Sequence, residues 1–404
     1  MKIFAHFIAI FCLCASAQAQ EQRTFSQDIR SLQLLVNDNP LRAPILERGE
    51  HVAIEFDELS HDYHRYVYHI QHCNADWTET EGLFESDFLA GFNDQPIEDY
   101  ENSFNTTQLY THYRLVLPNE ETGLRLSGNY RVQIFEDDDR EEPLLQAEFC
   151  IADPSMSIMA ELSGNTDIDF NQSHQQLSYT ISYGPHRVID PMRELHTVVM
   201  QNRRQDTKVV GLRPNIQKSN GVEFTHRREL IFPAGNEFHK FEILDVQKPG
   251  MNVDYMRWYE PYYHATLYAD TPARNYVYDE DQNGAFVMRN NDDEGDDVTT
   301  SEYLWVHFSL RTPRLNGPLY LYGQWANGFP DERCLMTYDD EAKAYRASVY
   351  LKQGYYNYMY LGENGTTPDG NFYETENEYI ILVYYRPQGG RYDQLVGYRV
   401  MKSN

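Results

Sequence analysis

The sequence predicts an all-β protein made of tandem β-sandwich domains, and three observations predict this class. Tyrosine is unusually frequent, with 32 residues, and together with 20 phenylalanines it supplies broad rings that pack well on pleated sheets. Short segments of alternating polar and apolar residues recur from end to end, separated by glycine, proline or asparagine. Apolar residues at helical spacing are nearly absent. Sheets with short connections are therefore expected throughout the chain.

The first group of expected strands belongs to one antiparallel sandwich. Each segment alternates in polarity and ends at turn residues, as strands with one buried face do. The expected strands are 51–56, 65–73, 112–117, 130–135 and 146–151. Asp153 precedes Pro154, and the residue before a proline is restricted to extended backbone, which suits a break between two units. We place the first domain at residues 20–153.

Two further groups of strands follow. The second group is 157–162, 176–182, 196–201, 228–232, 238–244 and 262–268, and the third is 303–310, 318–322, 345–351, 355–361, 379–385 and 394–400. Between them, residues 290–297 carry crowded negative charge and no apolar side chain, as a solvated linker does. This predicts a middle domain over 154–298 and a C-terminal domain over 299–404. Immunoglobulin-like or E-set sandwiches are expected, arranged as a row of stiff units.

The first 19 residues predict a secretory signal peptide. Lys2 precedes an apolar run over residues 3–13, and Ala17 and Ala19 satisfy the small-residue requirement of a cleavage site. Cleavage after Ala19 would leave a mature chain outside the cytoplasm. No later segment is long and apolar enough for a membrane-spanning helix, so no membrane anchor is expected. The formal charge of -28, from 34 basic and 62 acidic residues, argues against nucleic acid as a partner because phosphates would be repelled.

Three cysteines remain after the signal peptide, namely Cys73, Cys150 and Cys334. An odd number of thiols in a chain of this length is not a disulfide framework. Buried apolar thiols are the simpler interpretation. A bridge between Cys73 and Cys150 stays open if both strands belong to one sandwich.

The chain carries no pattern that indicates an enzyme, because zinc-protease, nucleophile-elbow, phosphate-loop and C-x-x-C motifs are all absent from the sequence. One segment resembles a calcium loop: Asp279, Asp281 and Asn283 occur as D-x-D-x-N-G, which supplies alternate oxygen ligands and a turn glycine. The closing carboxylate is missing, since Asn290 stands at its position. No cofactor is expected elsewhere in the chain, and a plain turn between two strands is the alternative to calcium binding at this segment.

The last domain is similar to glycogen-binding β-sandwich modules in the layout of residues 319–325 and 354–358. Such modules bind sugars by stacking them on exposed rings. The resemblance implies Trp325, Tyr356 and Tyr358 as ring candidates, and a periplasmic carbohydrate-binding protein as the alternative function. Alternation along the strands also allows such rings to fill the core.

A longer resemblance covers nearly the whole mature chain. The segment Ile70-Gln71-His72-Cys73-Asn74-Ala75-Asp76-Trp77 resembles the plug protein family of the Bacteroidota type IX secretion system, which carries a DUF5103-type N-terminal domain. Other matching segments are 91–93, Tyr100 with 103–106, 110–115, 118–120, 232–238, 249–254, 262–264, 351–358 and 372–379. The resemblance implies a non-enzymatic periplasmic subunit. It is expected to close the periplasmic mouth of the SprA outer-membrane β-barrel translocon when PorV and cargo are absent.

Residues 76–93 are the expected contact segment for that barrel. They connect strands without alternation and hold several rings that could anchor an interface. The candidates are Trp77, Phe84, Phe88 and Phe92. The alternative interpretation is a loop that packs on its own sandwich.

Overall fold

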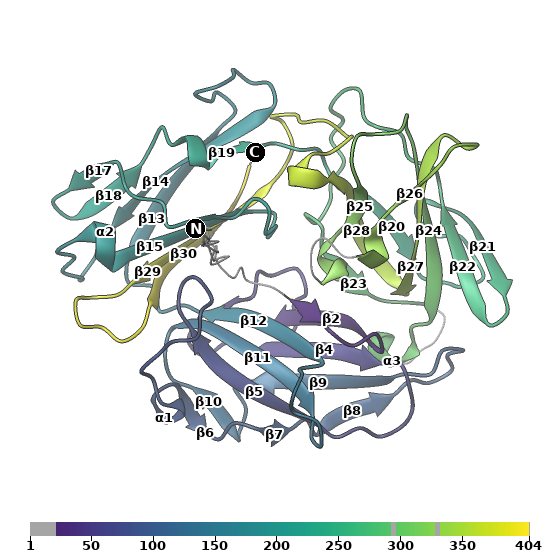
Figure 1. The fold of residues 1–404 in the computed structure, drawn as a ribbon, viewed down its shortest axis with the longest axis horizontal. Helices are drawn as coiled ribbons and strands as arrows, with labels where there is room; N and C mark the ends of the chain where they lie inside the picture. Colours follow the sequence, from purple (N-terminus) through teal and green to yellow (C-terminus); the bar gives the residue numbers. More distant parts are fainter. Residues whose placement is uncertain (1–21, 292–295, 328–331, 404) are drawn as a thin grey trace, which may run out of the picture.

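The computed structural model describes residues 22–291, 296–327 and 332–403. The predicted signal peptide therefore lies outside the described residues. Strands make up 48% of the structure and helices 6%, which confirms the all-β prediction. The sheets form three packed units, which we call modules 1, 2 and 3 (Figure 1).

Module 1 comprises residues 22–153 and packs two sheets around one core, which includes Phe56, Tyr113 and Tyr130. One sheet has the order β1 (Arg23–Thr24), β12 (Leu145–Ile151), β11 (Gly128–Glu136), β5 (Tyr66–Cys73) and β7 (Gln95–Pro96), with β3 (Ile45–Leu46) beside β12. The other has the order β2 (Ile29–Val36), β4 (Val52–Glu58), β9 (Thr111–Leu117) and β8 (Asp99–Asn102). The short helix α1 (Glu85–Phe88) leads into β6 (Leu89–Gly91), which pairs with β10 (Thr122–Leu124).

Module 2 combines two distant parts of the chain, residues 154–233 and 378–403. One sheet has the order β13 (Ser157–Ser163), β14 (His174–Ser182), β18 (Gly221–Phe224) and β17 (Ile216–Lys218), with β19 (Ile231–Pro233) beside β14. The other has the order β16 (Val209–Val210), β15 (Leu195–Gln201), β29 (Glu378–Tyr385) and β30 (Gln394–Lys402). The helix α2 (Pro191–Glu194) and the 3-10 turn η1 (Arg228–Leu230) precede β15 and β19.

Module 3 comprises residues 238–362 and also packs two sheets. One holds β28 (Gly354–Gly362) between β20 (His239–Ile243), β23 (Phe286–Met288) and β25 (Leu319–Tyr322). The other has the order β21 (Val253–Tyr259), β22 (Tyr262–Leu267), β24 (Tyr303–Arg311), β27 (Ala344–Lys352) and β26 (Thr337–Asp339). The helix α3 (Asp297–Thr300) and the 3-10 turns η2 (Gln324–Ala326) and η3 (Glu332–Cys334) lie in its connections, and η4 (Glu363–Gly365) directly follows β28.

The division that the sequence predicts at residue 298 differs from these modules. Strand β20, expected in the middle domain, pairs with β28, whereas β29, expected in the C-terminal domain, pairs with β15. The core of module 2 accordingly includes Tyr379 and Ile381, and the core of module 3 includes Phe241 and Phe286. Alternation shows that a segment has an apolar face, but it does not show which distant segment will cover that face. The predicted ranges 154–298 and 299–404 therefore do not each enclose one core.

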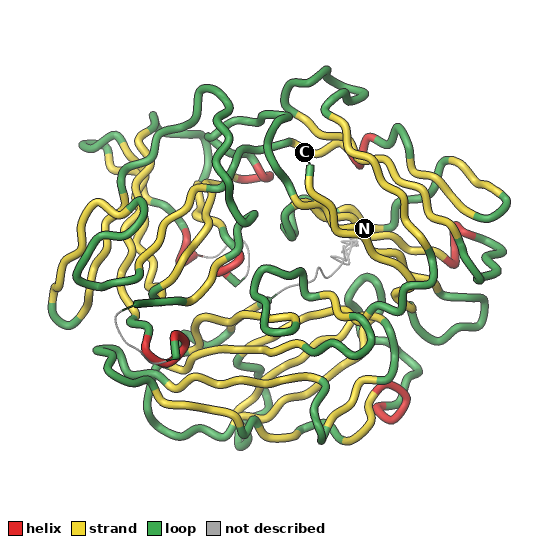
Figure 2. Tube along the Cα trace, turned by 180° about the vertical axis from the view of Figure 1, so that it is seen from behind, coloured by secondary structure: helices red, strands yellow, loops and turns green. Residues whose placement is uncertain are grey.

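The modules surround a common centre instead of forming the expected row (Figures 1 and 2). Modules 1 and 2 share an apolar cluster that includes Trp77 and Leu382. Modules 1 and 3 are joined by a buried ion pair between Asp57 and Lys352. Between modules 2 and 3, the Arg204 guanidinium lies 5.9 Å from the centre of the Tyr322 ring. Each module thus contacts the other two.

Two strands explain this arrangement, because each is buried on both faces. Every residue of β4 is buried: Val52, Ile54 and Phe56 enter the core of module 1, while Asp57, on the opposite face, meets module 3. In β29, Tyr379 and Ile381 enter the core of module 2, whereas Ile380 and Leu382 enter the cluster shared with module 1. A strand with two buried faces needs a second layer on each side. The neighbouring modules provide these layers.

Candidate functional site

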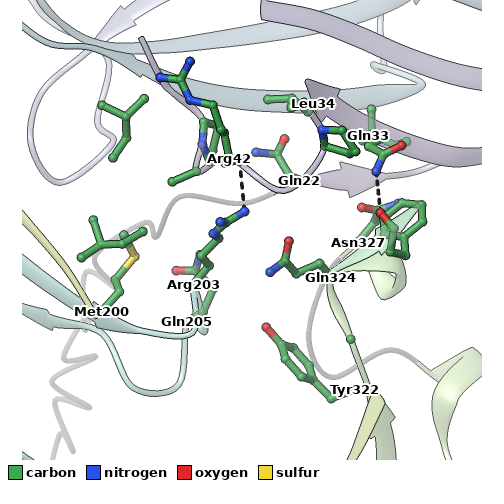
Figure 3. A pocket seen from close by; sticks show the side chains of 18 residues that line it. Gln22, Gln33, Leu34, Arg42, Met200, Arg203, Gln205, Tyr322, Gln324 and Asn327 are labelled. Atoms are coloured by element: carbon green, nitrogen blue, oxygen red, sulfur yellow. Dashed lines mark hydrogen bonds between the residues drawn. The ribbon is translucent and has the colours of Figure 1, made fainter. Parts of the chain in front are cut away.

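A pocket of about 140 Å³ lies where the three modules meet (Figure 3). Arg203 of module 2 donates to the backbone oxygen of Arg42 in module 1 at 3.1 Å, and its guanidinium pairs with Glu378 at 2.8 Å. Gln33 of module 1 donates through Nε2 to the backbone oxygen of Phe286 in module 3 at 2.9 Å. The pocket is smaller than typical small-molecule sites, and these polar groups are engaged in bonds between modules. This centre therefore serves as a junction.

The contact between modules 1 and 3 is built on charged residues. The Nζ atom of Lys352 lies 2.6 Å from Oδ2 of Asp57, and both side chains are fully buried. Asp57 also accepts hydrogen bonds from Nδ1 of His112 at 2.8 Å and from Oη of Tyr303 at 2.6 Å. The Lys352 ammonium lies 4.1 Å from the centre of the Tyr110 ring. Each charge is thus matched by an opposite charge, a hydrogen bond or an aromatic face, as burial requires.

The electrostatics of this pair favour a permanent contact. Burial lowers the pKa of Lys352, and the charge of Asp57 opposes this shift. Burial works against the Asp57 carboxylate as well, but the charge of Lys352 and the hydrogen bond from His112 hold the pKa of Asp57 below its ordinary value. If module 3 shifted while the interface stayed closed to water, each charge would be buried without its partner. This is strongly unfavourable in a low-dielectric site. Asp57 and Lys352 therefore fix the position of module 3 on module 1.

The four predicted barrel-contact residues divide between interior and surface. Trp77 is 2% exposed, has a left-handed backbone φ of 66°, and packs between modules 1 and 2. Phe88 lies in the core of module 1. The structure therefore agrees with the alternative interpretation for Trp77 and Phe88, in which they pack within the fold instead of contacting the barrel. Phe84 and Phe92 are each 75% exposed. They flank α1 and β6 at the outer edge of module 1 (Figure 1).

The predicted calcium residues have separate hydrogen-bond partners. The carboxylate of Asp279 lies 2.6 Å from Nζ of Lys240, so an ammonium group already stands beside it. Asp281 is buried and accepts hydrogen bonds from the backbone N–H groups of Phe238 and Asn283. Burial raises the pKa of Asp281 to about 7. No group of three or more His, Cys, Asp or Glu side chains in the described part of the chain is placed to hold a metal ion. Calcium binding stays a prediction, tested by titrating chelator-treated protein in a calorimeter.

The three predicted sugar-stacking rings are buried instead of exposed. Trp325, Tyr356 and Tyr358 are 7%, 2% and 2% exposed. The indole of Trp325 donates to the backbone oxygen of Asn357 at 2.8 Å, and Tyr358 donates to Asp270 at 2.7 Å. The burial of Tyr356 and Tyr358 follows from the position of β28 in the middle of its sheet, and Trp325 of η2 packs into the same core. The expectation of an exposed ring platform at these positions is wrong, since flat sugar stacking requires an accessible ring face.

Cys73, Cys150 and Cys334 are buried and none of them is in a disulfide, as the simpler interpretation predicts. Cys73 and Cys150 lie on the two strands that flank β11, because both are register partners of Asn129. Because β11 lies between these two strands, the Cα atoms of the two cysteines are two strand spacings apart, which is about 9–10 Å. A disulfide requires Cα atoms within about 7 Å, so the open alternative of a Cys73–Cys150 bridge is excluded by the fold.

Sequence reasoning missed the residues that join the modules, above all Asp57 and Lys352. A signal for Asp57 existed, because Glu55 and Asp57 place carboxylates on one face of a segment whose other face is strongly apolar. That pattern is also typical of an ordinary solvated face. Lys352 had no signal, since only the packing of module 3 brings its side chain to module 1.

The comparisons with known proteins agree with this architecture. Residues 29–153 match the family described as "Type 9 secretion system plug protein 1st domain". The fold is similar to the crystal structure, at 2.30 Å resolution, of a hypothetical protein from Parabacteroides merdae ATCC 43184. The TM-score is 0.91 and the sequence identity 39%, over 95% of this chain and 100% of that chain. No curated protein matches this chain significantly.

The fold defines a protein of three β-sandwich modules that are held together by buried contacts. Within the described residues, no helix has the length and apolar character needed to cross a membrane. The chain belongs to the type 9 secretion system plug protein family. Membership implies association with the secretion system and suggests a non-enzymatic, structural role.

Proposed function

We propose that this protein is a periplasmic plug subunit of the type 9 secretion system. It lies at the inner face of the outer membrane and closes the periplasmic side of an SprA-type β-barrel by protein–protein contact. Its role there excludes that of PorV. The observation that carries the proposal is the family match of residues 29–153, which lie within module 1. A wide barrel encloses a water-filled channel that would leak at rest, so it needs a reversible stopper.

The arrangement of the modules supports this role. A stopper must present a firm surface, because every group that becomes ordered on binding weakens the complex. In this protein the modules are held to one another by the Asp57–Lys352 pair, by the apolar cluster around Trp77 and by Arg203 at the centre. The outer surface of module 1 is therefore carried by a preorganised body. Little ordering is needed when it meets a partner.

Phe84 and Phe92 are the residues that we propose to contact the barrel. Both are highly exposed on the module that matches the family, and exposed rings that become fully desolvated contribute most to protein interfaces. The test is affinity purification of the tagged chain from envelopes. The F84A/F92A double variant should recover at least tenfold less barrel than the wild type. The control F170A removes a similarly exposed ring from module 2 and should recover the normal amount.

A second experiment tests closure itself. The purified barrel in a planar lipid bilayer should lose most of its conductance when the wild-type chain is added on the periplasmic side. The F84A/F92A variant should leave the conductance high at the same concentration. If the wild type leaves the conductance unchanged, the protein is not a plug. Mature chains that begin at Gln20 would support export through the predicted signal peptide.

A further inference from the structure

A second and larger pocket lies between modules 1 and 3. It has a volume of about 340 Å³, which is within the range of small-molecule sites. Strand β2 of module 1 forms one wall, and Arg30 lines the pocket from there. Trp305 of β24 and Tyr350 of β27 line it from module 3, with Arg333 at its edge. The pocket thus combines guanidinium groups with aromatic rings.

Arg30 is placed by an irregularity in β2. The register between β2 and β4 shifts between Arg30 and Gln33, and Ser31 has a left-handed φ of 53°. Such a conformation is unfavourable for serine, and bulges of this kind re-aim the neighbouring side chains. A hydrogen bond of 2.6 Å between Ser31 Oγ and Tyr303 Oη ties the bulge to module 3. The strand therefore departs from regular geometry at the residue that brings a positive charge to the pocket.

Arg30 lies in direct contact with no carboxylate of the described chain. Its Nη1 donates to the backbone oxygen of Ile29 at 3.0 Å, and no carboxylate of the described residues forms an ion pair with it. Burial lowers the pKa of Arg30 and the nearby charge of Arg333 lowers it further, and these two effects outweigh the opposite influence of Tyr303, Asp28 and Tyr350. A half-buried guanidinium of this kind is stabilised by an anion, and its planar fork fits a carboxylate with two hydrogen bonds. The pocket therefore favours a ligand with a negative group.

The wall that module 3 contributes to the pocket favours a ligand with a ring and several hydroxyl groups. The rings of Trp305 and Tyr350 lie 5.2 Å apart, and Tyr303 stacks on Tyr350 at 5.5 Å. Tyr350 donates through Oη to Oε1 of Gln108 at 3.1 Å, so its ring is held in place. Ser348 adds a hydroxyl group to the same wall. Aromatic faces beside small polar groups are suited to sugar rings, whose C–H faces are apolar and whose edges carry hydroxyls.

We propose that this pocket binds an acidic saccharide, whose carboxylate pairs with Arg30 and whose ring lies against Trp305 and Tyr350. The site spans two modules, so both must be present for binding. Its position differs from that of Phe84 and Phe92, and the proposal does not depend on contact with the barrel.

The test is calorimetry on the full mature chain with trigalacturonate as the probe and its neutral methyl ester as the matched ligand. Trigalacturonate should bind, and the ester should bind at least tenfold more weakly. R30Q and W305A should each weaken binding at least tenfold, and R30K should fall in between because it keeps the charge without the fork. The controls R257Q and W258A change the same residue types at the exposed hairpin of module 3, outside the pocket, and should bind normally.

Several outcomes would overturn the proposal. These are the absence of heat with trigalacturonate, equal affinity for the neutral ester, or full affinity in R30Q. Equal competition by inorganic phosphate would indicate a simple anion site, and tighter binding of a pentaglutamate peptide would indicate a peptide site, so either result contradicts a saccharide site. Circular dichroism checks that each variant is folded. If W305A does not fold, R30Q and R30K still decide the question.

Discussion

Lys352 of module 3 and Asp57 of module 1 form an ion pair of 2.6 Å in which neither side chain is exposed to solvent. The two residues are 295 positions apart in the chain. A buried pair of this kind specifies one geometry, because any other docking of the modules would bury a charge without its partner. The pair therefore fixes the geometry in which module 3 docks on module 1.

The first prediction concerns this pair. The variant K352M leaves the Asp57 carboxylate buried without its cation, and the free energy of unfolding should fall by about 3–5 kcal/mol. Denaturation in urea measures the loss. The control K402M removes an exposed ion pair with Glu376 and should change stability by less than about 1 kcal/mol. Equal stability of K352M and the wild type would show that the pair does not hold the modules together.

The second prediction concerns pH and His239. Burial disfavours the charged imidazole, but hydrogen bonds to Asp270 and Asp369 outweigh burial and raise the pKa of His239 from 6.5 to about 10. Below about pH 6.5 the folded and unfolded chains both carry the proton, and the contribution to stability is complete. Between pH 6.5 and 10 only the folded chain keeps it, so this contribution decreases as pH rises through that window and is lost above it.

The measurement is the stability difference between the wild type and H239Q as a function of pH. The difference should shrink by up to about 1.4 kcal/mol per pH unit between pH 6.5 and 10. A difference that is constant with pH would mean that His239 is not held in its charged form.

The third prediction separates packing residues from surface residues. W77A removes a ring from the cluster between modules 1 and 2 and should destabilise the protein by about 3–5 kcal/mol. F84A and F92A should each stay within about 0.5 kcal/mol of the wild type, since their rings are exposed. Thermal unfolding of the three variants compares them. A strongly destabilised F84A or F92A would assign that ring to the core.

The fourth prediction concerns the thiols. Burial raises the pKa values of Cys73 and Cys150 to about 12, and Cys334 is buried as well. A thiol reagent at neutral pH should therefore label the native protein very slowly, because the thiolate is the reactive form. In guanidinium without reductant, all three should react at once. Detection of only one reactive thiol in the unfolded protein would reveal a disulfide.

Local structure was largely predictable. The expected strands 51–56 and 379–385 correspond to β4 at Val52–Glu58 and β29 at Glu378–Tyr385, because alternating or continuous apolar segments reflect the period of a strand. The strand β2 at Ile29–Val36 was missed. Its alternation is interrupted at the bulge around Ser31, so the period-two signal fails there. That bulge also carries Arg30 into the proposed saccharide site.

The candidate site was less predictable for a physical reason. Segment 76–93 was expected to present four rings, and the structure buries Trp77 and Phe88 but exposes Phe84 and Phe92. The buried pair and the exposed pair are all aromatic residues, so residue type does not distinguish them. Only the layer packed against each ring decides whether it is interior or surface, and for Trp77 that layer is module 2.

The sequence by itself determined the all-β class, most strand positions, the burial of the thiols and the family, because these depend on local periodicity, composition and recognisable segments. Tertiary structure decided which strands share a sheet, how β29 joins module 2, and how Asp57 meets Lys352. Such contacts join residues hundreds of positions apart, and their energies depend on burial and exact partners. No local pattern records them, since an apolar face or a lone charge looks the same whichever surface finally covers it.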